Sequence, residues 1–292
     1  MKTGEHKPHT RAADKMIDLG VETLATQGLS VAFENIRMEE FIAASGVSRA
    51  TAYRRWPHRE EFIGEVLETA LHRISLIPED DQDLKRLVEM VIERLDALAT
   101  EQGRRNLVVE ALRTSLDADI RRLSGSVKWQ MMLSLSAAHH TLQPPRLRNR
   151  VAEALRSAEQ QMDQRRAEIY GNLAVMVGYR LTHGQDFKAM AVAMGTMMKG
   201  VVLRALPDPG WLDERHPAMM FDSTETVMWS QPEIMLTRVL LDHLEPNPSI
   251  EWNHETLMRS VRIFEQQVHL MMAHSENDDL PGADESDRSF SS

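Results

Sequence analysis

The stretch that decides the fold is GVSRATAYRRWPHREEF, residues 46–62, which holds four arginines in a chain whose formal net charge at pH 7 is −10. Gly46 predicts a tight turn, and Ser48 is a typical N-cap residue for a short helix that follows the turn. This helix is expected to end near Trp56, because Pro57 cannot donate an amide hydrogen in a helix interior. An acidic protein therefore places a local excess of positive charge on one short helix.

Apolar spacing predicts another short helix just before the turn, at 36–45, with Asn35 as its candidate N-cap. Two short helices joined by a turn that contains glycine are typical of a helix-turn-helix, in which the second helix enters the major groove of DNA. The alternative is a solvated basic face of an ordinary helical bundle, because a generic helix-turn-helix pattern has many false positives.

The second helix has two different faces. Ala52 and Trp56 lie four residues apart and are expected to face the core, which places Arg49 and Tyr53 on the opposite face. An exposed arginine can pair with guanine in the major groove, and other basic side chains can meet phosphates. The residues predicted to contact DNA are Ser48, Arg49, Ala50, Thr51, Tyr53, Arg54, Arg55 and Arg59.

The composition limits the class of protein. With 292 residues and 42% hydrophobic content, the chain can form one large domain or two modest ones. The absence of cysteine removes disulfides, thiolate catalysis and cysteine-ligated zinc. No apolar run approaches the roughly 18 residues that span a bilayer, and the polar N-terminus shows no apolar signal segment. We therefore expect a cytoplasmic protein with no membrane partner.

The remaining sequence reads as helical, without the alternation of β-branched residues that is typical of strands. We expect an all-α fold with an N-terminal helix-turn-helix domain of three helices that binds DNA, at 1–75. A larger helical bundle is expected at 76–274, followed by a disordered acidic tail at 275–292. The predicted helices are 10–27, 36–45, 48–56, 59–74, 80–100, 104–116, 120–140, 144–181, 187–206, 233–244 and 250–273, with Gly103 ending the fifth of them.

Two segments, KMIDLGVETLATQGL and MEEFIAASGVSRATAYRRWPHREEFIGEVL, resemble the N-terminal region of the TetR family of bacterial transcriptional regulators, over about residues 16–67. In the motif, Tyr53 follows Ser48 by five residues, Trp56 follows Tyr53 by three, and Arg59 follows Trp56 by three, as in that family. Ile42 departs from the family pattern, in which a small alanine is usual. The resemblance implies base contacts and phosphate contacts, respectively, from two sets of residues: Arg49, Ala50 and Tyr53; and Thr51, Arg55 and Arg59.

A weaker similarity, at GYRLTHGQDFKAMAVAMGTMMKGVVLRAL, is to the family's penultimate helix, which forms dimers. The family resemblance implies that the bundle at 76–274 serves ligand binding and dimerisation. It also implies a homodimer that binds double-stranded operator DNA at a palindrome, most often as a repressor, and that a small-molecule effector releases. Trp129, Met190 and Met194 are the predicted effector contacts, although the methionines also fit an ordinary core or interface face. The alternative function is a helical ligand-binding or protein-interaction module without an operator.

Catalytic and metal-binding patterns do not assemble in the sequence. It contains no Gly-x-Ser-x-Gly elbow, no phosphate loop and no HExxH motif. His139 and His140 are adjacent, and His269 and His274 are five residues apart, so neither pair matches two zinc ligands on one helix face. We expect no enzymatic activity, no metal and no cofactor.

Overall fold

The computed structural model describes residues 8–27, 37–74, 89–90, 92–253, 255–256, 258–260 and 262. The described chain is mostly helical, as predicted, but it also contains two antiparallel two-stranded sheets. Two compact units make up the chain. The first combines Met1–Ile74, Ile120–Arg165 and Met198–Pro209, and the second combines Ser75–Asp119, Arg166–Met197 and Gly210–Ser292. The predicted division at residues 75 and 274 stays a prediction.

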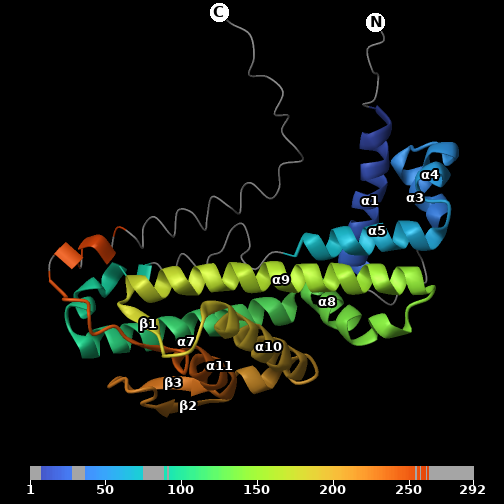
Figure 1. Ribbon diagram of the computed structural model, residues 1–292. Coiled ribbons are helices and arrows are strands. Elements are labelled where there is room, and N and C mark those ends of the chain that lie inside the picture. Colours follow the sequence, from blue (N-terminus) through green and yellow to red (C-terminus); the bar gives the residue numbers. More distant parts are fainter. Residues whose placement is uncertain are drawn as a thin grey trace, which may run out of the picture. The chain divides into compact units, whose positions relative to one another are not determined.

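The first unit begins with four helices: α1 (Pro8–Gln27), α3 (Met38–Ser45), α4 (Arg49–Arg55) and α5 (Arg59–His72). Helix α1 runs across α5, and α3 and α4 lie side by side (Figure 1). Gly20 permits the close approach of α1 to α5, since a Cβ atom there would lie 2.6 Å from Cγ2 of Val66. These contacts hold α1 against α5, and α3 and α4 in turn contact α1.

Further helices complete the first unit: α8 (Val127–Ala138), the 3-10 helix η2 (His139–Thr141), and the N-terminal part of α9 (Pro145–Met176). Arg150 of α9 pairs with Glu68 of α5 at 2.6 Å, and it passes close to Gly64, where a Cβ atom would lie 3.0 Å from its Cδ. Lys199, on the part of α10 that belongs to this unit, pairs with Glu159. The four N-terminal helices are thus attached to α9 by an ion pair and by packing.

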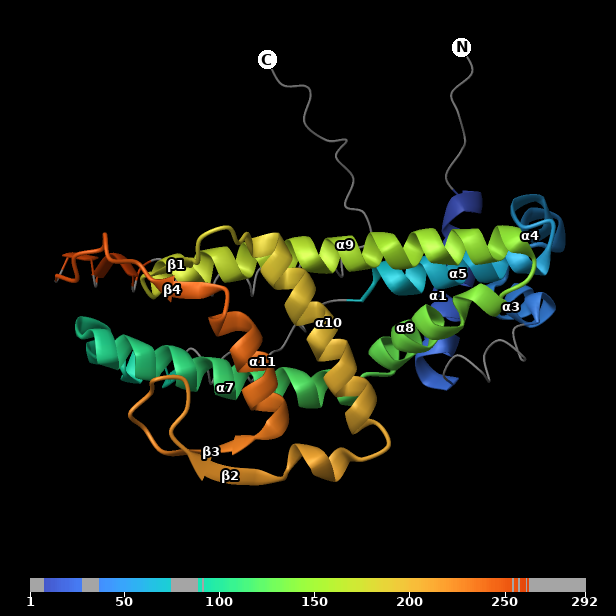
Figure 2. The same cartoon turned by 60° about the horizontal axis from the view of Figure 1, so that its bottom comes forward.

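The second unit contains short strands and a hairpin next to its helices. Strand β1 (Tyr179–Leu181) pairs with β4 (Leu244–Pro246), and β2 (Arg215–Ala218) pairs with β3 (Val227–Ser230). The β2–β3 hairpin lies beside α11 (Figure 2). The other elements are the 3-10 helix η1 (Leu95–Ala99), α7 (Glu101–Gly125), α10 (Phe187–Ala205), the 3-10 helix η3 (Pro209–Leu212) and α11 (Gln231–Leu241). The C-terminal parts of α7 and α10, and Pro209 of η3, belong to the first unit.

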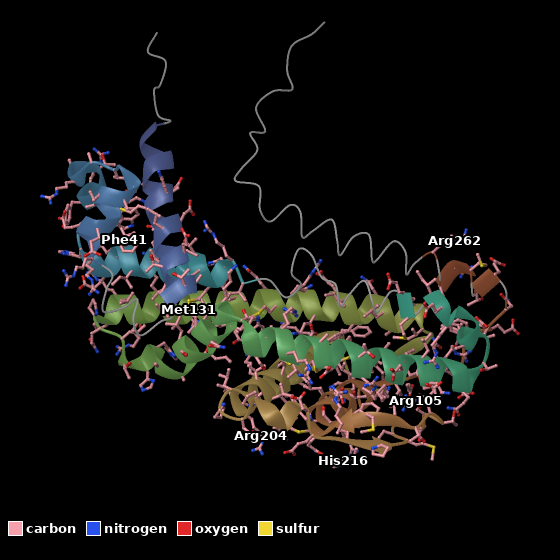
Figure 3. All side chains as sticks on the ribbon, turned by 180° about the vertical axis from the view of Figure 1, so that it is seen from behind. Phe41, Arg105, Met131, Arg204, His216 and Arg262 are labelled. Carbon is pink, nitrogen blue, oxygen red and sulfur yellow. The ribbon has the colours of Figure 1, made fainter. Side chains whose placement is uncertain are left out.

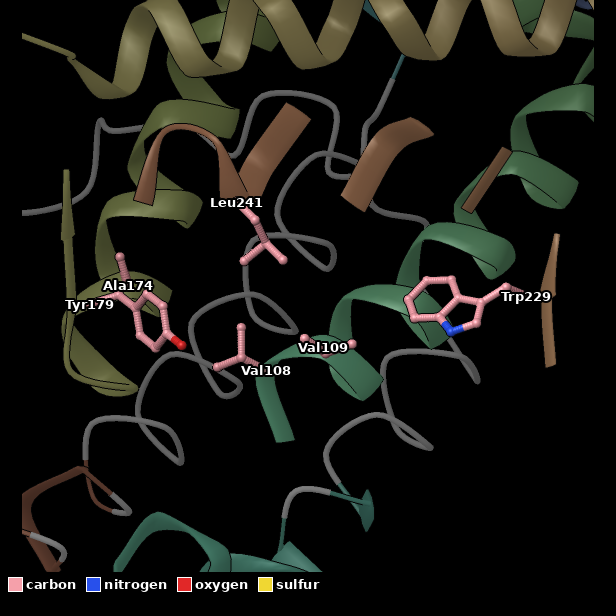
Figure 4. Close-up of a cluster of buried hydrophobic side chains, with 6 residues drawn as sticks. All are labelled: Val108, Val109, Ala174, Tyr179, Trp229 and Leu241. Carbon is pink, nitrogen blue, oxygen red and sulfur yellow. The ribbon is translucent and has the colours of Figure 1, made fainter. Parts of the chain in front are cut away.

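A buried apolar cluster joins the elements of the second unit. Helix α7 contributes two adjacent valines, and β3 contributes Trp229, whose ring packs edge-on against Phe221 at 5.5 Å between centroids. In the same unit, Glu233 is fully buried and pairs with Arg215 at 3.0 Å. Figure 4 shows the six buried members, from α7, α9, β1, β3 and α11: Val108, Val109, Ala174, Tyr179, Trp229 and Leu241.

Several predicted helix boundaries are wrong. Arg37 occupies the N-cap of α3 without a side-chain cap, so the helix begins at Met38; the predicted cap, Asn35, lies outside the described residues. Gly103 does not end a helix, because α7 runs from Glu101 without a break. A Cβ atom at Gly103 would lie only 2.2 Å from the carbonyl oxygen of Ala97, so glycine is required by close approach of the preceding turn.

The two helices predicted at 104–116 and 120–140 are replaced by α7 and α8, with the break at Gly125–Ser126. Ser126 accepts a hydrogen bond from the amide of Trp129 at 3.3 Å, so a side-chain cap places the break there. The helix predicted at 144–181 ends at Met176 and is followed by β1. The range 80–88, most of 250–273 and the tail at 275–292 lie outside the described residues, whereas Leu95–Ala99 is a 3-10 helix and residues 251–253 are not helical.

Among the described residues, no helix combines the length and the apolar character that crossing a bilayer requires.

Candidate nucleic-acid interface

The turn between α3 and α4 has the predicted construction. Gly46 has φ 74°, in the left-handed region, and its amide donates to the carbonyl of Ile42 at 3.2 Å, which closes α3. Ser48 then caps α4, accepting a hydrogen bond from the amide of Thr51 at 3.2 Å. The turn and the cap together fix the direction in which α4 leaves α3.

The inner face of α4 is anchored as predicted. Ala52 is fully buried, and Trp56 is 1% exposed. The indole of Trp56 packs edge-on against Phe62 at 5.1 Å between centroids, and its Nε1–H donates to Glu65 Oε2 at 2.7 Å. Because this face is buried, the opposite face of α4 is directed to solvent.

Most of the residues predicted to contact DNA lie on the exposed side of the motif. Thr51 is half-buried, and the others are exposed: Ser48, Arg49, Ala50, Tyr53, Arg54, Arg55 and Arg59. Within the described ranges, the structure gives Arg54 no hydrogen bond or ion pair, so its charge is available to a phosphate. The contacts with DNA themselves stay predictions.

One carboxylate joins the two side chains predicted to read bases. Glu39, in the first turn of α3, pairs through Oε2 with Arg49 Nη2 at 2.8 Å, and its Oε1 accepts a hydrogen bond from the Tyr53 hydroxyl at 2.9 Å. The hydrogen bond to Glu39 raises the pKa of Tyr53 above its ordinary value, because ionisation would break it and add a second negative charge. The sequence analysis missed Glu39, since its role depends on how α3 crosses α4.

Arg55 differs from its neighbours on α4. Its guanidinium pairs with Asp14 of α1 at 3.2 Å and with Glu65 of α5, and it lies 4.9 Å from the ring centroid of Trp56. These contacts connect three helices within the protein. A phosphate would have to compete with two carboxylates for Arg55, so the structure gives this residue a role inside the fold.

The predicted effector contacts belong to two different units. Trp129 is buried in the first unit, whereas Met190 and Met194 are buried in the part of α10 that belongs to the second. Their side chains act as core packing. Within the described residues, the indole Nε1–H of Trp129 has no hydrogen-bond partner.

A different hollow occurs in the second unit, with a volume of about 310 Å³. Two of its lining residues, Trp211 and Trp229, fall in the proline-rich range 207–248. In the sequence they are isolated aromatic residues, and no pattern indicates that they line one site. The hairpin that brings them together has no clear strand pattern in the sequence. The lining consists of Trp211, Glu214, His216, Ala218, Trp229, Gln231 and Ile234.

Within the described ranges, no three His, Asp or Glu side chains come together in an arrangement that could hold a metal ion.

A scan against protein-family models and a search of characterised proteins each found no match. Among solved structures, the chain is similar to the reduced form of Escherichia coli NemR, with 12% sequence identity and a TM-score of 0.44. The alignment covers 82% of this chain and all of that chain.

Proposed function

We propose that this chain is a sequence-specific DNA-binding regulator of transcription, a repressor that acts as a homodimer. The observation that carries the proposal is the anchored helix α4. Its inner side is buried at Ala52 and Trp56, and Trp56 packs against Phe62 of α5, while Arg49 and Tyr53 are exposed on the opposite side. A helix fixed in this way can enter a major groove and present an arginine and a tyrosine to base edges.

The charge distribution also supports this reading. The whole chain carries a formal charge of −10, so it would bind a polyanion poorly except where basic residues cluster. Arg54 and Arg59 are exposed at that cluster and can meet phosphates, which supply most of the salt-dependent affinity. The acidic remainder limits unspecific binding to DNA.

Helix α10 offers a surface for the second copy. Val192 and Leu203 are 44% and 52% exposed, and they lie on one helix face with Thr196 and Gly200. A Cβ atom at Gly200 would meet no atom within 4 Å, so the backbone is open to close approach by another helix. A two-fold axis here would use the same face twice, as in most homodimers. The two copies of α4 would then bind half-sites about 34–36 Å apart.

A small-molecule effector that binds one arrangement of the dimer more tightly would release it from DNA. Effector and operator then oppose each other with a reciprocal coupling free energy of about 1–3 kcal/mol. The hollow in the second unit is the candidate effector site, in place of Trp129, Met190 and Met194.

The test is selection of duplexes from a random double-stranded library, followed by titration of the enriched duplex and a scrambled duplex at two salt concentrations. A regulator is expected to enrich a palindrome and to prefer it strongly over the scrambled duplex. Equal affinity for both duplexes would leave the alternative function, a ligand-binding module without an operator.

A further inference from the structure

The hollow of the second unit is built on one side of the β2–β3 hairpin. His216 of β2 lies directly opposite Trp229 of β3 in the register, and it is exposed (Figure 3). Successive side chains of a strand point to opposite sides, so residues two apart in the sequence share a side. Glu214, His216 and Ala218 line the hollow, and Arg215 between them does not.

Aromatic and aliphatic groups form most of the wall. The indoles of Trp211 and Trp229 are both buried and both line the hollow, together with Ile234 of α11. A volume of about 310 Å³ is at the lower end of the range for small-molecule sites, roughly 300–1,000 Å³. The size therefore favours a ligand with one or two rings rather than an extended molecule.

The charge of the lining is negative. Glu214 contributes an exposed carboxylate, and no lysine or arginine belongs to the lining. The nearest arginine in sequence, Arg215, is already paired with Asp117 at 2.8 Å and with Glu233 at 3.0 Å. A cation in the hollow would meet the carboxylate of Glu214 and the imidazole of His216 but no lysine or arginine. Indole faces attract cations more strongly than other aromatic rings do.

A buried donor in the wall also lacks a partner. The Nε1–H of Trp229 is buried, and within the described structure it makes no hydrogen bond. An indole N–H and an ammonium group are both donors only, so a cationic ligand would not complete this bond, and the preference for a cation rests on Glu214 and the indole rings.

We propose that this hollow binds a small aromatic amine in its cationic form, with its ring against the indoles and its ammonium group near Glu214. Its effector role rests on the proposed function, whereas binding itself does not and can be measured without DNA. The geometry disfavours aromatic acids of the same size, because their carboxylate would face Glu214.

Three probes of similar shape test the charge preference on the full chain: 2-phenylethylamine, 2-phenylethanol and 3-phenylpropionate. Binding is measured by calorimetry and by the rise in melting temperature, because a ligand that binds the native state stabilises it. The amine is expected to bind more tightly than the alcohol, and the acid least tightly. Absence of saturable binding by the amine, or equal binding of amine and acid, would overturn the proposal.

The variant Glu214→Gln is expected to weaken the amine about fivefold and to leave the alcohol unchanged, as suits an ion pair at an exposed rim. Glu251→Gln is the matched control, since Glu251 is an exposed acid of the same unit that does not line the hollow. Trp211→Leu is expected to weaken all three probes. Equal loss in Glu214→Gln and Glu251→Gln would mean that general charge, and not this site, attracts the amine.

The effector role has a separate readout. If the amine binds at this site but leaves the affinity for an enriched duplex unchanged, the binding site is confirmed and its regulatory role is refuted. If the protein shows no preference for any duplex while the amine still binds, the proposed function falls and the ligand site remains.

Discussion

Replacing Glu39 with glutamine perturbs the pair of side chains on which base reading is proposed to depend. Glu39 holds the guanidinium of Arg49 at 2.8 Å and the hydroxyl of Tyr53 at 2.9 Å. The substitution keeps the size of the side chain but removes its charge. We expect a lower preference for the enriched duplex over random DNA and a stronger salt dependence on random DNA, because Arg49 becomes free to bind phosphates.

The effect on folding should be small. The side chains of Arg49 and Glu39 are 75% and 46% exposed, and exposed ion pairs typically contribute about 0.2–1 kcal/mol. The free energy of unfolding, measured by urea denaturation, should therefore fall by no more than about 1 kcal/mol. Any larger change in DNA binding would then come from the interface itself.

Glu39→Gln is expected to affect DNA binding in two ways. The guanidinium of Arg49 is released from its ion pair, and its orientation is no longer fixed. One additional phosphate contact steepens the plot of log K against log salt by about 0.9, which amounts to an extra loss of about 3.5-fold between 50 and 200 mM salt. An unrestrained side chain costs about 0.5–1.5 kcal/mol to fix on binding. The ratio of specific to random affinity should therefore fall on the order of fivefold.

A titration reports the same contact without DNA. Glu39 raises the pKa of Tyr53 from its ordinary value of 10.0, so the folded state holds this proton more tightly than the unfolded state does. The resulting stabilisation is present below the unfolded pKa and is lost as the pH rises through the folded pKa. In Glu39→Gln, the tyrosinate absorbance of Tyr53, assigned with Tyr53→Phe, should appear at lower pH than in the wild type.

Glu40→Gln is the matched control. Glu40 is the next residue on α3, and its side chain faces Arg37 at 3.9 Å rather than α4. This variant removes the same charge from the same helix and should leave the specificity ratio and the titration of Tyr53 unchanged. The reasoning is refuted if both variants change the specificity ratio equally, or if Glu39→Gln leaves the ratio and the titration as in the wild type.

Five further variants, one of them a control, test other parts of the account. Gly46→Ala should destabilise the fold by roughly 1–2 kcal/mol in urea denaturation, because φ is 74° there, whereas Gly125→Ala, at an open helical position, should be neutral or stabilise. Gly103→Ala should lower the free energy of unfolding by about 1–3 kcal/mol through overpacking, and a wild-type melting temperature would contradict the close approach. In duplex titrations, Arg49→Ala should lose about 1–3 kcal/mol of discrimination at one base position, whereas Arg59→Ala should weaken all duplexes alike and flatten the salt slope by about one.

Local chemistry made helix α4 predictable. A serine cap, a glycine in the left-handed region and a proline after the helix act over only a few residues, so Gly46, Ser48 and Pro57 could be interpreted from the sequence alone. The spacing of Ala52 and Trp56 likewise gave the buried face of α4. These features depend on the backbone of a single short segment.

Features that depend on how elements meet could not be predicted in this way. Glu39 reads as one more acid of an amphipathic helix, and its contact with Arg49 exists only at the observed crossing of α3 and α4. Glu233 reads as a surface residue, but it is buried because it completes a capping box and pairs with Arg215 from the hairpin. The hairpin could not be predicted from the sequence either, because β2 consists of Arg, His, Pro and Ala rather than β-branched residues.

The same distinction between local features and contacts among elements applies to the predicted effector contacts. Trp129, Met190 and Met194 were chosen for residue type, and they form packed interior in two different units. Trp211 and Trp229 were equally visible in the sequence. Only the pairing of β2 with β3 and the position of η3 show that these two line one hollow.

The most direct test of the central claim is the affinity of the full chain for an enriched duplex relative to a scrambled duplex of equal length, at 50 and 200 mM salt. Sequence-specific binding predicts a palindromic duplex, bound at least about 10³-fold more tightly than the scrambled one at the higher salt. The account also predicts that Arg49→Ala lowers this ratio by changing the preference at one base pair in each half-site. Equal affinity for the two duplexes at both salt concentrations would contradict the proposal that α4 reads DNA sequence.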